Sequence, residues 1–154
     1  MPGRDFRQLP ILVLMHKVET RFRVRYAETD QMGLVYYANY CVWMEVGRVA
    51  YCRESGFKYR DMEREGGVML TVTEAKCRYR ASARFDDEIR VQTWLTEARS
   101  RTVRFAYEMH RASGDHNDQL LVSGETLHMV CDLEGKPVRL PEQYRKFFPL
   151  GLFS

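Results

Sequence analysis

The sequence predicts an α+β domain in which one long buried helix is wrapped by a five-stranded antiparallel sheet. Three observations predict it: an alternating segment at 18–26, an apolar stretch from about Val35 to Glu54, and four strand-like segments after residue 67. A helix that is apolar around most of its surface is buried on most sides, which requires a sheet that curls around it. With 154 residues the chain is most simply one domain with a sizeable core.

The first two elements differ in their hydrophobic period. The segment "VETRFRVRY" (18–26) alternates between apolar and charged or polar side chains, which is typical of a strand with one buried face. From about Val35 to Glu54 the alternation disappears and no proline interrupts the chain. Gly56 stands where such a helix would end. The polar segment "KYRDMEREGG" (58–67) predicts a short surface helix or turn.

The second half of the chain is rich in strands. Segment 68–81 alternates and then changes phase, which predicts a bulge near Glu74. Segments 88–97 and 102–111 are expected to form a hairpin, and 120–132 a further strand after the polar turn 112–119. Pro141 is expected to begin a last short helix through Phe147. The edges and open face of this sheet favour association with a second copy.

Composition excludes several classes of function. The chain is 45% apolar and 29% charged, as in soluble globular proteins. A formal charge of +3 does not imply a nucleic-acid partner. The run "LPILVLM" is too short to span a membrane and lacks a signal-peptide cleavage site, so no membrane insertion and a cytoplasmic location are expected. Residues 1–14 are predicted to be an extension that precedes the domain of residues 15–154. Met15 could itself be the first residue of that domain.

Cysteine and histidine provide no evidence for a metal site. The four cysteines include no CxxC pair, and each lies in an apolar or alternating segment where a buried reduced thiol is the commoner state. The four histidines match no metal-ligand spacing. We therefore expect no metal and no redox cofactor.

The acidic turn before the long helix carries the most specific pattern. The segments "YAETDQMGLVYYANY" (26–40) and "WME" (43–45), with the order β-α-β-β-β-β, resemble the hotdog-fold acyl-CoA thioesterases. The similarity is greatest to the 4-hydroxybenzoyl-CoA thioesterase and YbgC-like branch. It covers residues 18–147 at the level of the fold, and its D-x-x-G-x-V-x-Y-x-N-Y spacing is dense. The segment "ARFDDEIRVQT" (83–93) shows a second, weaker similarity to the same family.

The resemblance implies the roles of several residues. Asp30 would be the catalytic carboxylate, acting as nucleophile or as general base, and the backbone N–H of Tyr37 would polarise the thioester carbonyl. Asn39 and Tyr40 match the family pattern beside that site, and Tyr36 and Tyr40 are candidates to line an acyl pocket. Many relatives carry histidine where this chain has Tyr37, so Asp30 would act with less help. Coenzyme A enters as part of the substrate, and no separate cofactor is implied.

Basic residues suggest how the nucleotide part of coenzyme A could be held. Lys76, Arg78, Arg80 and Arg84 recur along and just after one predicted strand. Arginine binds phosphate oxygens in bidentate fashion, although the same charges would also discourage pairing of an edge strand. In relatives the ligand groove forms between two protomers, so the resemblance implies a homodimer that assembles to a homotetramer.

Several alternatives stay open on the sequence alone. Asp30 could be an ordinary helix cap. Glu45 could compete for the catalytic role, although an ion pair with Arg48 is the favoured interpretation. Asp86 and Asp87 are expected to shape a turn. A hotdog dehydratase would need a histidine between residues 31 and 38, and there is none. A non-catalytic module that binds acyl-CoA or acyl-carrier protein is the main rival to the thioesterase, and acyl-carrier protein is also an alternative substrate carrier.

Overall fold

The computed structural model describes residues 16–112 and 118–152. The predicted extension of residues 1–14 and most of the predicted polar turn lie outside the described residues. The elements follow in the order β1 (Val18–Arg23), η2 (Tyr26–Glu28), α2 (Asn39–Ser55), α3 (Tyr59–Gly66), β2 (Val68–Tyr79), β3 (Glu88–Arg99), β4 (Thr102–Arg111), β5 (Gln119–Asp132), α4 (Glu142–Arg145) and β6 (Gly151–Leu152). The predicted strands and the long helix are therefore confirmed.

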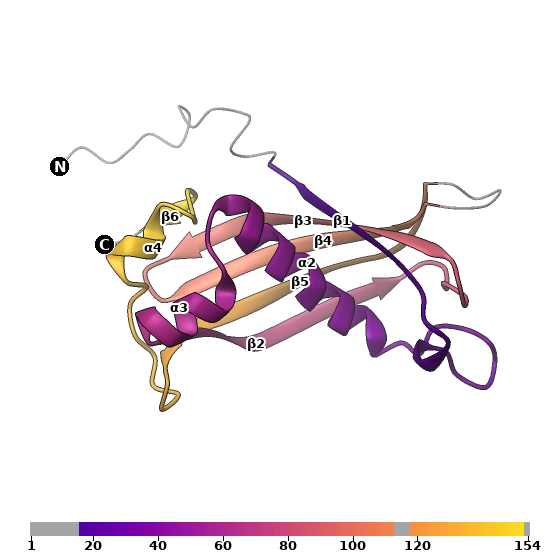
Figure 1. The fold of residues 1–154 in the computed structure, drawn as a ribbon, viewed down its shortest axis with the longest axis horizontal. Helices are drawn as coiled ribbons and strands as arrows, with labels where there is room; N and C mark the ends of the chain where they lie inside the picture. Colours follow the sequence, from indigo (N-terminus) through magenta and orange to yellow (C-terminus); the bar gives the residue numbers. More distant parts are fainter. Residues whose placement is uncertain (1–15, 113–117, 153–154) are drawn as a thin grey trace.

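The sheet has the order β1-β3-β4-β5-β2, and all neighbours in it are antiparallel. The short strand β6 adds a parallel pairing to the end of β3, which the sequence did not predict. Figure 1 shows α2 lying across one face of the sheet, with β2 at one edge. The predicted bulge is confirmed, because the β2–β5 register shifts between Val72 and Glu74.

Helix α2 starts later than predicted. Val35 and its neighbour Leu34 form isolated bridges with Thr29 and Arg84, so this part of the motif is extended and the helix begins only at Asn39. The predicted end is confirmed: Gly56 follows the helix with φ of 113°, a left-handed conformation that glycine adopts without steric cost.

Only one side of α2 is buried within the chain. Its core-facing residues are Tyr40, Trp43, Met44, Gly47, Tyr51 and Cys52. Gly47 permits a close approach to β3, because a Cβ atom there would collide with Thr93 Oγ1. On the other side Val42 and Val46 remain 48% and 39% exposed. The expectation that the helix is buried on most sides is therefore wrong for a single chain.

The remaining local predictions are mostly confirmed. The surface helix is α3, which buries Met62 and is followed by Gly67 in a left-handed conformation. The last helix, α4, is shorter than expected and ends at Arg145. Asp87 shapes its turn by accepting the backbone N–H of Arg84 at 2.9 Å. Within the described residues, no helix is both long and apolar enough to cross a membrane.

Candidate active site

Asp30 lies in a tight turn that its own side chain stabilises. Asp30 Oδ1 accepts the backbone N–H groups of Met32 at 2.9 Å and Leu34 at 3.3 Å. The backbone N–H of Asp30 donates to Leu34 O at 2.8 Å, and Gly33 completes the turn with φ of +77°. Among the described residues, Asp30 Oδ2 has no hydrogen-bond donor. One carboxylate oxygen therefore fixes the turn, and the other makes no hydrogen bond among the described residues.

The helix-cap interpretation of Asp30 is wrong. Helix α2 begins at Asn39, nine residues later, and its N-cap position is Ala38, which makes no side-chain cap. The carboxylate of Asp30 therefore caps its own turn and does not cap the helix.

Glu28 is a buried residue beside the candidate site that the sequence analysis did not single out. Its side chain is buried, with 6% of the residue exposed. Glu28 Oε2 accepts Trp43 Nε1–H at 2.6 Å, and Oε1 accepts the backbone N–H of Arg25 at 2.8 Å and Arg25 Nε at 3.3 Å. Burial acts to raise the pKa of this carboxyl group, but these hydrogen bonds outweigh it and leave the pKa below the usual 4.5. Glu28 thus anchors the loop to α2 as a carboxylate.

The backbone of Glu28 holds the start of the helix in the same way. Glu28 O accepts the N–H of Tyr36 at 2.9 Å and Asn39 Nδ2 at 2.8 Å. Asn39, a predicted binding residue, therefore links the Asp30 loop to the first turn of α2. These bonds place Tyr37 directly beside the loop. No described residue accepts a hydrogen bond from the backbone N–H of Tyr37.

The predicted tyrosines divide into two groups. Tyr36 and Tyr37 are exposed and pack against each other with ring centroids 4.7 Å apart. Tyr79 donates its hydroxyl to Tyr37 O at 3.2 Å, which ties the end of β2 to the helix start. Tyr40 is buried, packs edge-on against Trp43, and accepts the N–H of Ala83 at 3.1 Å. Tyr40 is therefore part of the core rather than of an open pocket.

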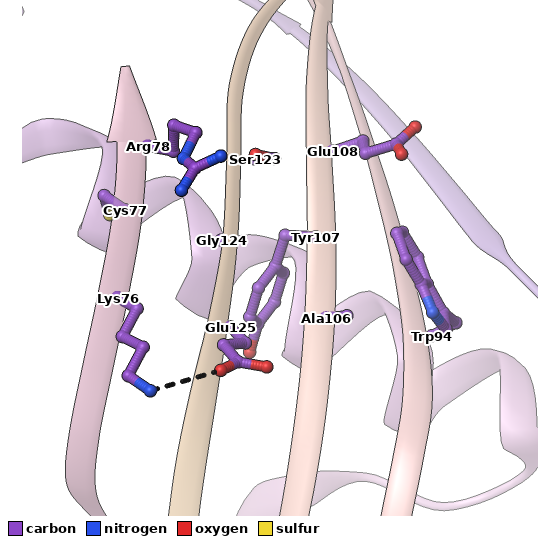
Figure 2. Close-up of a pocket in the computed structure, with 10 residues that line it drawn as sticks. All are labelled: Lys76, Cys77, Arg78, Trp94, Ala106, Tyr107, Glu108, Ser123, Gly124 and Glu125. Atoms are coloured by element: carbon purple, nitrogen blue, oxygen red, sulfur yellow. Dashed lines mark ion pairs between the residues drawn. The ribbon is translucent and has the colours of Figure 1, made fainter.

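The three predicted phosphate-binding arginines are separated. Arg84 forms a bridge with Leu34 and so lies beside the Asp30 loop. Arg80 is exposed just after β2. Arg78 lies over the opposite face of the sheet, in a hollow of about 480 Å³ that Trp94 and Glu125 also line (Figure 2). This larger hollow faces away from α2. Of the three arginines, only Arg84 pairs with the loop, since the backbone N–H of Arg80 donates to Leu121 O of β5.

A smaller and more enclosed cavity lies between α2 and β2. It measures about 140 Å³ and is lined by Glu45, Arg48, Val49, Cys52, Tyr59, Leu70 and Phe105. The expected Glu45–Arg48 ion pair is not present among the described residues, since Arg48 Nη1 instead donates to the Tyr107 hydroxyl at 3.2 Å. Glu45 is exposed at this cavity. It lies more than one helical turn beyond the start of α2, whereas Asp30 lies in the loop before it.

The described residues hold no group of three or more histidine, cysteine, aspartate or glutamate side chains that could bind a metal ion. All four cysteines are free. Cys52 and Cys131 are buried as expected, but Cys41 is exposed and Cys77 only half-buried. The expectation of a buried thiol is therefore wrong for Cys41.

Comparison with known proteins identifies the family. The family model described as "Thioesterase-like superfamily" matches residues 24–148. This chain belongs to that superfamily. YneP of Bacillus subtilis (strain 168) is 38% identical to it over 136 residues, which are 88% of this chain and 92% of YneP. "Acyl-CoA thioesterase YbgC" of Haemophilus influenzae is 30% identical over 128 residues, or 82% of this chain and 90% of the relative.

A solved structure of the hypothetical protein TT1821 from Thermus thermophilus superposes with a TM-score of 0.78 at 37% identity, covering 89% of this chain and 99% of that one. The architecture is the hotdog fold that the sequence predicted. As a member of the thioesterase-like superfamily, the protein is a thioester hydrolase.

The sequence offers one indication that Glu28 belongs to the site, which is its position within the matched segment. Glu28 precedes Asp30 by two residues, but nothing in the pattern indicates that its side chain turns inward to meet Trp43. That contact joins residues 15 positions apart across a loop, and such pairs depend on the tertiary arrangement.

Proposed function

We propose that this thioesterase-like protein hydrolyses acyl-CoA thioesters, with Asp30 as the catalytic carboxylate and the backbone N–H of Tyr37 as the oxyanion donor. One observation carries the proposal: Asp30 Oδ2 has no donor and the N–H of Tyr37 has no acceptor among the described residues, while hydrogen bonds from Tyr36 and Asn39 to Glu28 O tie the helix start to the same loop. The acyl-CoA substrate is inferred from the name of the relative YbgC.

The chemistry fits these two groups. Asp30 Oδ2 attacks the thioester carbonyl or removes a proton from the water that does. Negative charge then develops on the carbonyl oxygen, where the Tyr37 N–H and the positive end of the α2 dipole stabilise it. The thiol leaves readily because a thiol pKa of about 8.5 demands little protonation. A serine–histidine pair is therefore unnecessary.

The nucleotide part of coenzyme A is proposed to contact Arg84 and Arg80. Arg84 is bridged to the Asp30 loop through Leu34, and both arginines are exposed. Neither has a carboxylate partner among the ion pairs of the described residues, so both are available to phosphate oxygens. Arg78 faces the other side of the sheet and is given no part in this contact.

The active unit is proposed to be a homodimer. Val42 and Val46 are exposed on α2, and β2 is exposed from Thr71 to Lys76. Strand β2 stands at one end of the strand order, so one of its edges is unpaired within the described sheet. Exposed apolar side chains beside an unpaired edge favour a second copy as the partner. Assembly of two dimers into a tetramer is a prediction from the family resemblance.

The test compares Asp30→Asn with a matched variant, Asp132→Asn. Asp132 Oδ1 accepts the N–H groups two and four residues later, of Glu134 at 3.0 Å and Lys136 at 2.8 Å, as Asp30 does in its own turn. Asparagine keeps the accepting oxygen, so both variants should fold. Thiol release from a panel of acyl-CoAs should fall at least about a hundredfold in Asp30→Asn only.

The other outcomes separate the alternatives. Full turnover in Asp30→Asn would refute the catalytic role of this residue. Binding of acyl-CoA without turnover in the unmodified protein would identify a non-catalytic binding module. Single turnover in labelled water would distinguish nucleophile from general base, because only a covalent intermediate leaves solvent oxygen in the Asp30 carboxyl group.

A further inference from the structure

Two cysteines face each other across the space between α2 and β2. Cys41 lies in the first turn of α2 and is exposed, and Cys77 lies on the helix-facing side of β2 and is half-buried. Their Sγ atoms are 3.8 Å apart. Neither thiol has a part in the proposed hydrolysis.

The position of this pair is defined by its neighbours along the same two elements. On one side, Tyr79 contacts Tyr37 at the helix start. On the other side lies the 140 Å³ cavity, to which α2 contributes Glu45, Arg48 and Cys52. Residues 41, 45, 48 and 52 are spaced four, three and four apart and so share one face of the helix.

Strand β2 runs in the opposite direction along that face. Tyr79 is opposite the helix start, Cys77 is opposite Cys41, and Leu70 reaches the cavity. The thiol pair therefore lies between the start of α2 and the cavity. An acyl group that runs along this face from a thioester at Tyr37 to the cavity passes the two sulfur atoms; this part rests on the proposed function.

We propose that Cys41 and Cys77 are an oxidant-sensitive thiol pair, which forms a reversible disulfide with a peroxide and thereby closes the passage from the helix start to the cavity. Cys41–SH is oxidised by hydrogen peroxide to the sulfenic acid, with release of one water. Cys77 then attacks that sulfur, forms the S–S bond and releases a second water. Two thiols are oxidised and one peroxide is reduced to two waters.

The geometry and exposure of the pair fit this order of steps. A disulfide needs the sulfur atoms about 2 Å closer than they are, which side-chain rotation can supply when the two Cβ atoms are suitably placed. Cys41 is the more exposed of the two thiols in the single chain and therefore meets the oxidant first. Burial, followed by the proximity of Cys41, raises the pKa of Cys77 to about 11. Because the thiolate is the attacking species, bond formation should be slow at neutral pH and faster as the pH rises.

The experiment treats the full chain with hydrogen peroxide, then maps its peptides without reduction and measures acyl-CoA turnover. We expect a linked peptide pair containing Cys41 and Cys77, loss of most turnover, and recovery of both with dithiothreitol. Cys41→Ser and Cys77→Ser should each abolish the linked pair and keep turnover under peroxide, whereas Cys131→Ser should behave like the unmodified chain.

Three results would overturn the proposal. The first is oxidation of Cys41 without a linked peptide, and the second is a disulfide to another cysteine. The third is formation of the Cys41–Cys77 bond with turnover unchanged, which would remove its effect on the passage. If the reduced protein shows no acyl-CoA turnover at all, the proposed function fails, while the peptide map still decides whether the thiols pair.

Discussion

Replacing Glu28 with glutamine tests whether its buried carboxylate holds the Asp30 loop on α2. The carboxylate accepts the buried N–H of Trp43 at 2.6 Å and the backbone N–H of Arg25 at 2.8 Å through different oxygens. An amide has only one oxygen, so one of these donors will face an NH₂ group in Glu28→Gln.

The magnitude follows from these two contacts. A buried donor without an acceptor costs about 1–3 kcal/mol, and the remaining hydrogen bond loses its charge assistance, about 1 kcal/mol more. The exposed Arg25 side chain adds little. A loss of about 2–4 kcal/mol in the free energy of unfolding corresponds to a melting temperature lower by about 4–16 °C for a domain of this size. The turnover number should fall as well, because the loop that carries Asp30 loses its anchor.

The assay unfolds Glu28→Gln and the unmodified protein with denaturant at several pH values between 7 and 3. Tryptophan fluorescence monitors the unfolding. The folded-state pKa of Glu28 lies below its usual 4.5, so its stabilising effect is present above pH 4.5 and is lost as the pH falls through the lowered value. The two stabilities should therefore converge below pH 4.5. Glu134→Gln, at an exposed turn, is the control and should match the unmodified protein. Equal stability of Glu28→Gln and the unmodified protein at pH 7 would refute this reasoning.

Three further predictions concern the ligand, the core and the assembly. Arg84→Ala should raise KM for acyl-CoA about tenfold and leave hydrolysis of an acyl-N-acetylcysteamine thioester unchanged; an equal effect on both substrates would contradict a phosphate contact. Burial, and then the charge of Arg48, lowers the pKa of His128 to about 4, so the unfolded chain binds a proton that the folded one does not. The free energy of unfolding, measured by urea titration, should thus decrease by roughly 3 kcal/mol as the pH is lowered from 6.5 to 4. The decrease should be smaller in His128→Gln. Val46→Glu should convert the dimer to a monomer in light scattering, and an unmodified protein that is already monomeric would exclude the proposed interface.

The sequence alone determined the fold and the candidate catalytic segment, because both depend on local patterns. Alternation with period two specifies strands with one buried face, and the change of phase near Glu74 marked the bulge. Gly56 marked the helix end because its left-handed conformation is costly for other residues. The motif around Asp30 identified the family for the same reason: its residues are consecutive in the chain.

The tertiary structure decided everything that depends on residues distant in sequence. Val35 to Ala38 are compatible with a helix, but pairing of the 34–35 segment with 29 and 84 keeps them out of it. Glu28 became an anchor because the fold brings it to Trp43. Arg78 was separated from Arg84 because β2 ends at Tyr79, and the chain after it turns to pair Arg84 with Leu34. Local propensity selects the elements, whereas burial and long-range hydrogen bonds determine which side chains meet at the site.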